Sequence, residues 1–184
     1  MRNPSPKSGK KKATLSPPTV GIVSLGCPKN LVDSEVMAGY LSEAGFGFTD
    51  DPEKADVLIV NTCSFIAPAV EEAKQSLREM ARLKTAGTCR ILICAGCLPQ
   101  REGRALTEEF PEVDLFMGID EIPHIGEWVC RLLETERPAS AETRLPTYLY
   151  DDTSPRLVST PPWTAYVKIA EGCLHACSFC TIPS

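Results

Sequence analysis

The segment Asp56-Val-Leu-Ile-Val-Asn-Thr62 is a short apolar run that leads directly into Cys63. Runs of this kind are typical of strands that are buried on both faces of a parallel sheet. The same pattern occurs upstream, in Val20-Gly-Ile-Val-Ser-Leu-Gly26, and downstream, in Arg90-Ile-Leu-Ile-Cys-Ala-Gly96. Three copies of one buried-strand pattern predict a parallel sheet.

Apolar residues at helical spacing separate these runs. The first helix is expected from Asn30 to Gly45, with Asn30 as the N-cap and Asp33 as its capping-box partner. A second helix is expected from Pro68 to Gly87, and a shorter one covers about 100–109. A further strand at Asp114-Leu-Phe-Met-Gly118 and a last helix marked by Ile125, Trp128, Val129, Leu132 and Leu133 complete the pattern. Alternating strands and helices predict an α/β fold with a doubly wound parallel sheet over residues 19–135.

The regions outside 19–135 differ in composition. Residues 1–18 are basic and rich in Lys, Pro and Ser, which predicts a disordered tail. Residues 136–160 have no periodicity and are expected to form a linker, whereas Thr164-Ala-Tyr-Val-Lys-Ile-Ala170 is expected to open a strand within 161–184. The whole chain of 184 residues has a formal net charge of −5, so the part beyond the tail is more acidic still and a poor general surface for nucleic acid. No signal peptide and no long apolar run are present, which predicts a cytoplasmic protein with no membrane association.

The chain has nine cysteines, a number that points to metal or redox chemistry in a reducing compartment. Cys27, Cys63 and Cys97 each follow a predicted parallel strand. Loops at the carboxyl ends of parallel strands gather at one edge of the sheet, so we expect these three thiols to form a metal site. Structural roles are expected for the others in this region, Cys89, Cys94 and Cys130, although Cys94 and Cys97 could instead act as a redox pair.

A second group, Cys173, Cys177 and Cys180, has the spacing C-x3-C-x2-C. Structural zinc sites normally have four protein ligands, so three thiolates without a fourth local ligand favour a [4Fe-4S] cluster with one open iron. The alternatives are a zinc knuckle that lacks a ligand, a disulfide loop, or chance clustering. His175 is interpreted as a solvated loop residue rather than a ligand.

This spacing, with the aromatic Phe179 just before the last cysteine, resembles the signature of radical S-adenosylmethionine (SAM) enzymes. The resemblance implies that the open iron binds SAM and that an electron from the cluster splits it to give a 5'-deoxyadenosyl radical. It also implies that Phe179 lines the adenosyl pocket and that a separate electron donor exists.

The combination of both cysteine groups resembles the methylthiotransferases. The stretches Ser24-Leu-Gly-Cys-Pro-Lys-Asn-Leu-Val-Asp-Ser-Glu35, Asn61-Thr-Cys-Ser-Phe-Ile66 and Tyr166-Val-Lys-Ile-Ala-Glu-Gly-Cys173 are similar to the RimO branch of that family. The resemblance implies two [4Fe-4S] clusters, with the auxiliary one on the strand-end cysteines and Lys29, Asn30 and Asn61 in support of it. The implied reaction adds a methylthio group to the β-carbon of an aspartate in ribosomal protein uS12 of the small ribosomal subunit.

Two alternatives stay open. The tRNA-modifying branch usually has Gln-Met-Asn where this chain has Pro28-Lys29-Asn30, which disfavours that substrate. A non-catalytic iron–sulfur or zinc-binding module is the other alternative. The family continues into a βα barrel of which this chain holds only the first strand and cysteine loop, so we expect an amino-terminal fragment that is inactive alone.

Overall fold

A computed structural model of the protein describes residues 17–87, 89–135, 139–140, 146–175, 177–180 and 182. The predicted basic tail therefore lies almost wholly outside the described residues. The sheet has six parallel strands in the order β2-β1-β3-β4-β5-β6. Their bounds are β1 Thr19–Ser24, β2 Gly47–Phe48, β3 Val57–Thr62, β4 Ile91–Gly96, β5 Leu115–Met117 and β6 Ala139–Ser140. The four strands expected within residues 19–135 are confirmed as β1, β3, β4 and β5, whereas β2 and β6, of two residues each, are too short for the apolar pattern to predict.

Five α-helices and two short 3-10 helices connect the strands in the described chain. The α-helices are α1 Pro28–Glu43, α2 Ala67–Ala86, α3 Cys97–Glu102, α4 Arg104–Glu109 and α5 Ile125–Thr135, and the 3-10 helices are η1 Pro52–Lys54 and η2 Ile119–His124. The predicted helix over 100–109 is in fact two helices, because Gly103 between them has a φ of +51°. The start of α1 also corrects the prediction, since Cys27 occupies the N-cap position and Asn30 lies inside the first turn.

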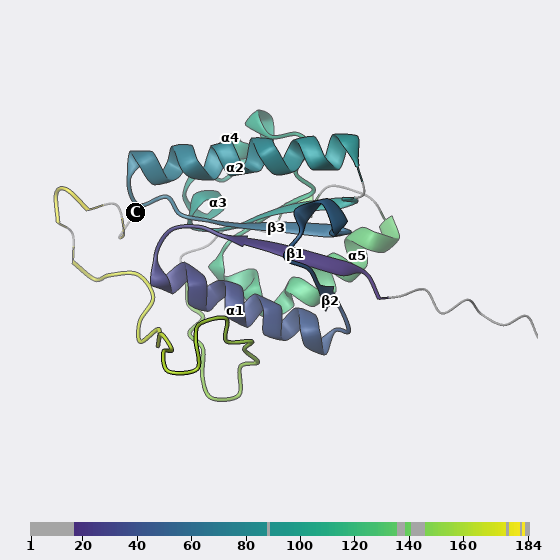
Figure 1. Ribbon diagram of the computed structural model, residues 1–184. Coiled ribbons are helices and arrows are strands. Elements are labelled where there is room, and N and C mark those ends of the chain that lie inside the picture. Colours follow the sequence, from purple (N-terminus) through teal and green to yellow (C-terminus); the bar gives the residue numbers. More distant parts are fainter. Residues whose placement is uncertain are drawn as a thin grey trace, which may run out of the picture.

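Helices cover both faces of the sheet, as a doubly wound fold requires. Figure 1 shows α2 and α4 on one face and α1 and α5 on the other. Two separate apolar cores result, one around Met37, Ile93 and Val129 and the other around Leu77 and Leu92. The chain leaves β1 toward β2 on one side and later places β3 on the other side of β1, so the strand order reverses between β1 and β3. Ligands of open α/β sheets bind outside the carboxyl ends of the strands at such a switch point.

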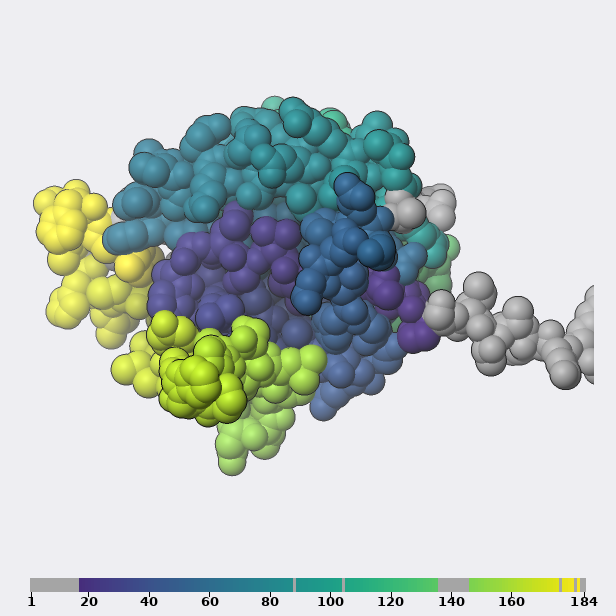
Figure 2. Space-filling model, in the orientation of Figure 1, coloured from purple at the N-terminus to yellow at the C-terminus, as the bar shows by residue number. Residues whose placement is uncertain are grey.

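The segment 146–182 contains no helix or strand among its described residues. The expected strand over residues 164–170 is therefore not formed, because no neighbouring strand pairs with it and an isolated strand leaves its backbone groups without partners. The predicted linker lies against α1 rather than free of the domain, as Figure 2 shows for the green and yellow-green atoms over that helix. Among the described residues, no helix has the length and apolar character needed to span a membrane.

Candidate functional site

The three cysteines predicted to meet do stand at equivalent positions of adjacent strands. Cys27 follows β1 as the N-cap of α1, Cys63 follows β3, and Cys97 follows β4 as the first residue of α3. The strand pairing brings these ends together, since Ser24 is in register with Asn61 and Thr62 with Gly96. We call this edge of the sheet, where β1, β3 and β4 end, the carboxyl edge.

Two glycines allow the thiols to approach one another at the carboxyl edge. Gly26 has a φ of +87°, and a Cβ on it would lie 2.4 Å from the Cβ and 3.0 Å from the Sγ of Cys63. Gly96 has a φ of +94°, and a Cβ there would lie 2.3 Å from Asn61 Oδ1. Each glycine directly precedes a cysteine of the group; a side chain at Gly26 would clash with Cys63, and one at Gly96 would clash with Asn61 and the backbone of Thr62.

Two buried asparagines tie the loops of the carboxyl edge to each other. Asn30 Nδ2 donates to the carbonyls of Leu25 at 3.0 Å and Thr62 at 2.9 Å, which bridges the ends of β1 and β3. Cys97 Sγ donates to Asn30 Oδ1 at 3.6 Å. Asn61 Nδ2 donates to the carbonyl of Asn30 at 2.8 Å, while Asn61 Oδ1 is buried with no hydrogen-bond partner in the described chain. The proposed supporting role of Asn30 and Asn61 therefore has a physical basis, and Asn30 holds loops rather than capping α1.

The environment of Cys97 disfavours its thiolate. Burial, and after it the nearby Cys63 thiol and Asp33 carboxyl, raise the pKa of Cys97 to about 12. A thiol in such a place becomes a thiolate when a cation binds it, because coordination to a metal removes the proton outright. The raised pKa means that Cys97 is protonated at neutral pH and is not a free nucleophilic thiolate.

The remaining cysteines of the α/β domain do not belong to this group. Cys94 is wholly buried within β4, and this burial raises its pKa to about 12, so it is an inert core thiol rather than half of a redox pair. Cys89 is also buried, and its Sγ donates to the carbonyl of Ile91 at 3.2 Å. Cys130 is exposed and lies in α5, which is not one of the elements that follow β1, β3 or β4.

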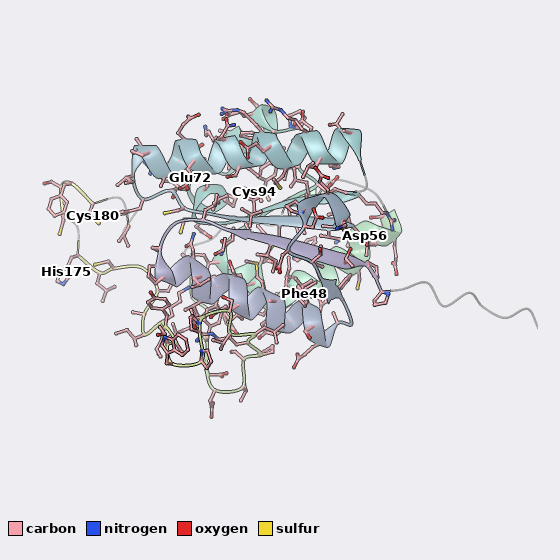
Figure 3. All side chains as sticks on the ribbon, in the orientation of Figure 1. Phe48, Asp56, Glu72, Cys94, His175 and Cys180 are labelled. Carbon is pink, nitrogen blue, oxygen red and sulfur yellow. The ribbon has the colours of Figure 1, made fainter. Side chains whose placement is uncertain are left out.

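The second cysteine group lies in an exposed loop beyond the domain. Cys173 and Cys177 are exposed, and Figure 3 shows Cys180 and His175 projecting away from the sheet. The backbone N–H of His175 donates to Cys173 Sγ at 3.4 Å, and that of Cys180 donates to the carbonyl of Cys177 at 3.0 Å. The side chain of Phe179 is 89% exposed, so no described residue encloses it in a pocket.

Sequence reasoning missed a set of buried charges that joins this loop to α1. Lys168 Nζ pairs with Asp33 Oδ1 at 2.7 Å and with Glu171, and Lys29 Nζ pairs with Glu171 Oε1 at 3.2 Å. Asp33 is therefore an ion-pair partner and not part of a capping box. The available signal in the sequence was weak: a lysine within an apolar run, and two acids, Asp33 and Glu35, in the first half of a helix that is otherwise rich in apolar residues.

The side chains at the carboxyl edge that could act as metal ligands are the thiols of Cys27, Cys63 and Cys97. Within the part of the chain that the structure describes, no three His, Cys, Asp or Glu side chains lie close enough to chelate one metal ion. A four-iron cluster holds its ligands farther apart than a single ion does, and thiolates are its usual ligands. Three thiols from adjacent strands, with Cys27 exposed at the rim, have the chemistry and the access that such a cluster needs.

The same chain is similar to curated bacterial proteins along most of its length. It is 53% identical over 169 residues to a ribosomal protein uS12 methylthiotransferase RimO of Syntrophus aciditrophicus, and 51% identical over 167 residues to one of Desulforamulus reducens. Each match covers 90% of this chain and 37% of the relative, so the chain spans well under half the length of these relatives. A third, from Trichlorobacter lovleyi, is 46% identical over 94% of this chain and 38% of its own length.

A protein family matches the part of the chain that forms the sheet. Residues 19–118 match the family described as uncharacterized protein family UPF0004, and this match extends from β1 to the end of β5. It includes Cys27, Cys63 and Cys97 together with Asn30 and Asn61. More than half of the chain lies within the match, and the chain therefore belongs to the UPF0004 family.

Proposed function

We propose that the protein is a radical SAM methylthiotransferase that adds a methylthio group to the β-carbon of an aspartate in ribosomal protein uS12. The observation that carries the proposal is the placement of Cys27, Cys63 and Cys97 directly after the adjacent strands β1, β3 and β4, together with a docked segment that leads into C-x3-C-x2-C. The similarity to relatives named ribosomal protein uS12 methylthiotransferase RimO supports the choice of substrate. The small ribosomal subunit and an electron donor are then the partners, and the cytoplasm is the compartment.

We assign an auxiliary [4Fe-4S] cluster to Cys27, Cys63 and Cys97 and a SAM-binding [4Fe-4S] cluster to Cys173, Cys177 and Cys180. Residues 161–184 would begin the radical SAM domain, which places Phe179 beside SAM. When bound, the clusters and SAM supply the radical and sulfur-transfer chemistry that an unactivated C–H bond requires.

The side chains around the carboxyl edge would hold the cluster ligands in place. The side-chain nitrogen of Asn30 bridges the ends of β1 and β3, so Asn30 orients the loops that carry Cys27 and Cys63. Asn61 holds the backbone of Asn30 in place through its amide nitrogen. The packed cores on the two faces of the sheet support the strands that carry the three thiols, which favours a fixed spacing of these thiols.

Iron analysis tests the ligand assignment. A chain of the full length of the relatives, purified without oxygen and reconstituted with iron and sulfide, should lose about half of its iron when Cys27, Cys63 and Cys97 are replaced by Ala. The matched control replaces Cys89, Cys94 and Cys130 by Ala and should keep all of it. Iron loss in the control would show that the wrong thiols were chosen, and bound zinc without labile sulfide would contradict a cluster altogether.

Mass spectrometry tests the reaction. The full-length protein is incubated with SAM and a reductant, together with either small ribosomal subunits or tRNA. A methylthio mass on the uS12 aspartate supports the proposal, whereas the same mass on tRNA alone would refute the substrate. The auxiliary-site variant should still cleave SAM to 5'-deoxyadenosine, because its Cys173 loop is unchanged, but should not modify uS12.

A further inference from the structure

Two acidic side chains on α1 face protein rather than solvent. Asp33 and Glu35 are each only 2% exposed, although acids on the surface helices of a domain normally point into water. A buried carboxylate is costly unless hydrogen bonds and opposite charges satisfy it. The partners of both acids lie more than 100 residues further along the chain, in the segment 148–171 that leads to the C-x3-C-x2-C loop.

Glu35 holds the middle of that segment. Its Oε2 accepts two hydrogen bonds from the Arg156 guanidinium, from Nε at 2.9 Å and from Nη2 at 2.6 Å, and such charge-assisted hydrogen bonds are stronger than neutral ones. Its Oε1 accepts from the backbone N–H of Ser159 at 2.7 Å and from the Ser159 hydroxyl at 2.8 Å. The N–H of Leu157 also donates to the carbonyl of Glu35 at 3.0 Å. Both carboxylate oxygens are thus satisfied, and residues 156–159 are fixed on α1.

Asp33 holds the end of the segment. Its Oδ1 accepts from the Tyr150 hydroxyl at 2.6 Å and from Lys168 Nζ at 2.7 Å. The ammonium of Lys168, whose side chain is 2% exposed, also lies 5.0 Å from the centre of the Tyr150 ring. Burial alone would lower the pKa of Lys168, but the carboxylates of Asp33 and Glu171 outweigh it and hold that pKa above its usual value. Lys168 is therefore a buried cation.

These contacts link the two thiol groups through alternating charges. The order is Lys29, Glu171, Lys168, Asp33, and the formal charges of the four side chains cancel. Lys29 lies two residues after Cys27, and Glu171 lies two residues before Cys173. The ion pair between Lys29 and Glu171 thus joins the start of α1 at the carboxyl edge to the start of the C-x3-C-x2-C loop.

We propose that Asp33, Lys168, Glu171 and Lys29 are positioning residues that anchor the start of the C-x3-C-x2-C loop to α1 at the carboxyl edge. A buried ion network adds little net stability compared with apolar packing, but breaking it leaves an uncompensated charge, so it fixes one arrangement over others. The proposal depends on the proposed function only in that the proposed function assigns the two cysteine groups as cluster ligands. The contacts among these four residues involve side chains of this chain alone, so they can be tested without iron or activity.

Proteolysis tests the docking. Trypsin cleaves after lysine only when the chain can open, and the cleavage rate follows the open population. Replacing Asp33 by Asn keeps the size of the side chain but removes the charge that holds Lys168, so cleavage after Lys168 should become at least about tenfold faster. Lys168→Arg keeps both the cation and the trypsin site and should stay protected. Lys74→Met, which removes a lysine paired with Glu102 and Glu109 on α2, is the control and should change nothing.

A second measurement separates positioning from general stability. A short bismaleimide is used to cross-link exposed Cys27 to Cys173 in the metal-free chain, and the linked peptides are quantified by mass spectrometry. The cross-link should form in the parent and in Lys74→Met and should fall several-fold in Asp33→Asn, while cleavage after Lys84 within the domain stays slow. Equal cross-linking and equal cleavage after Lys168 in parent and Asp33→Asn would overturn the proposal. Faster cleavage at every site in Asp33→Asn would also overturn it, because the role of Asp33 would then be stability alone.

Discussion

Gly96 gives the sharpest test of how the carboxyl edge is built. Its backbone has a φ of +94° and a ψ of −147°, a region that is essentially restricted to glycine and costs about 1–3 kcal/mol for other residues. In Gly96→Ala the new methyl would also lie 2.3 Å from Asn61 Oδ1 and 2.7 Å from the carbonyl oxygen of Thr62. Relief of such a contact within a packed sheet costs about another 1–3 kcal/mol. We therefore expect Gly96→Ala to lower the free energy of unfolding by about 3–5 kcal/mol.

Gly45 provides a matched control, because it too has a positive φ, +88°, but a Cβ there would meet nothing within 4 Å. Gly45→Ala should cost only about 1–2 kcal/mol, from backbone strain alone. A difference of about 2 kcal/mol between the two variants corresponds to about 1 M in the midpoint of urea unfolding. Circular dichroism during urea titration of the metal-free chain measures the unfolding midpoint of each variant. Equal midpoints for Gly96→Ala and Gly45→Ala would refute the close approach of Gly96 to Asn61.

Three further predictions concern the segment on α1, the core and the thiols. Burial alone would raise the pKa of Glu35, but hydrogen bonds from Ser159 and Arg156 hold this pKa below its ordinary value of 4.5. The docking of residues 156–159 on α1 should therefore be intact above pH 4.5. It should weaken as the pH falls through the lowered pKa of Glu35. Hydrogen exchange at the Leu157 amide measures this, and protection that is independent of acid would contradict it. Met37→Ala should cost about 2–5 kcal/mol in urea unfolding because Met37 is fully buried, and the half-buried Met80→Ala should cost clearly less. Iodoacetamide at neutral pH should label exposed Cys130 and leave Cys94 unlabelled in the folded chain, and the opposite result would show that Cys94 is not buried.

The α/β fold could be predicted from the sequence because its signals are local. A strand buried on both faces must be apolar at every position, as Val57–Val60 is, so three such runs separated by helical periodicity indicate a parallel sheet. The positions of Cys27, Cys63 and Cys97 relative to those strands are also local facts. Their meeting at one edge follows from the general rule for parallel sheets.

The tertiary structure decided which loops are neighbours and which polar groups share partners. Only the strand order places β1 beside β3 and β3 beside β4, and only that order lets Asn30 bridge Leu25 and Thr62. The pattern around Asn30 and Asp33 is typical of a helix start, yet both side chains have partners elsewhere in the fold.

The dependence on tertiary neighbours also explains why the strand predicted over residues 164–170 is not formed. An apolar run predicts a strand, but a strand needs a neighbour with which to pair, and the structure instead fixes this segment through the charge of Lys168. The spacing of apolar residues in a sequence indicates which side chains are buried. It does not indicate which other residues those side chains contact. The contacts of Asp33 and Glu35 join residues more than 100 positions apart, and such pairings follow from the folded arrangement of the whole chain rather than from any stretch of it.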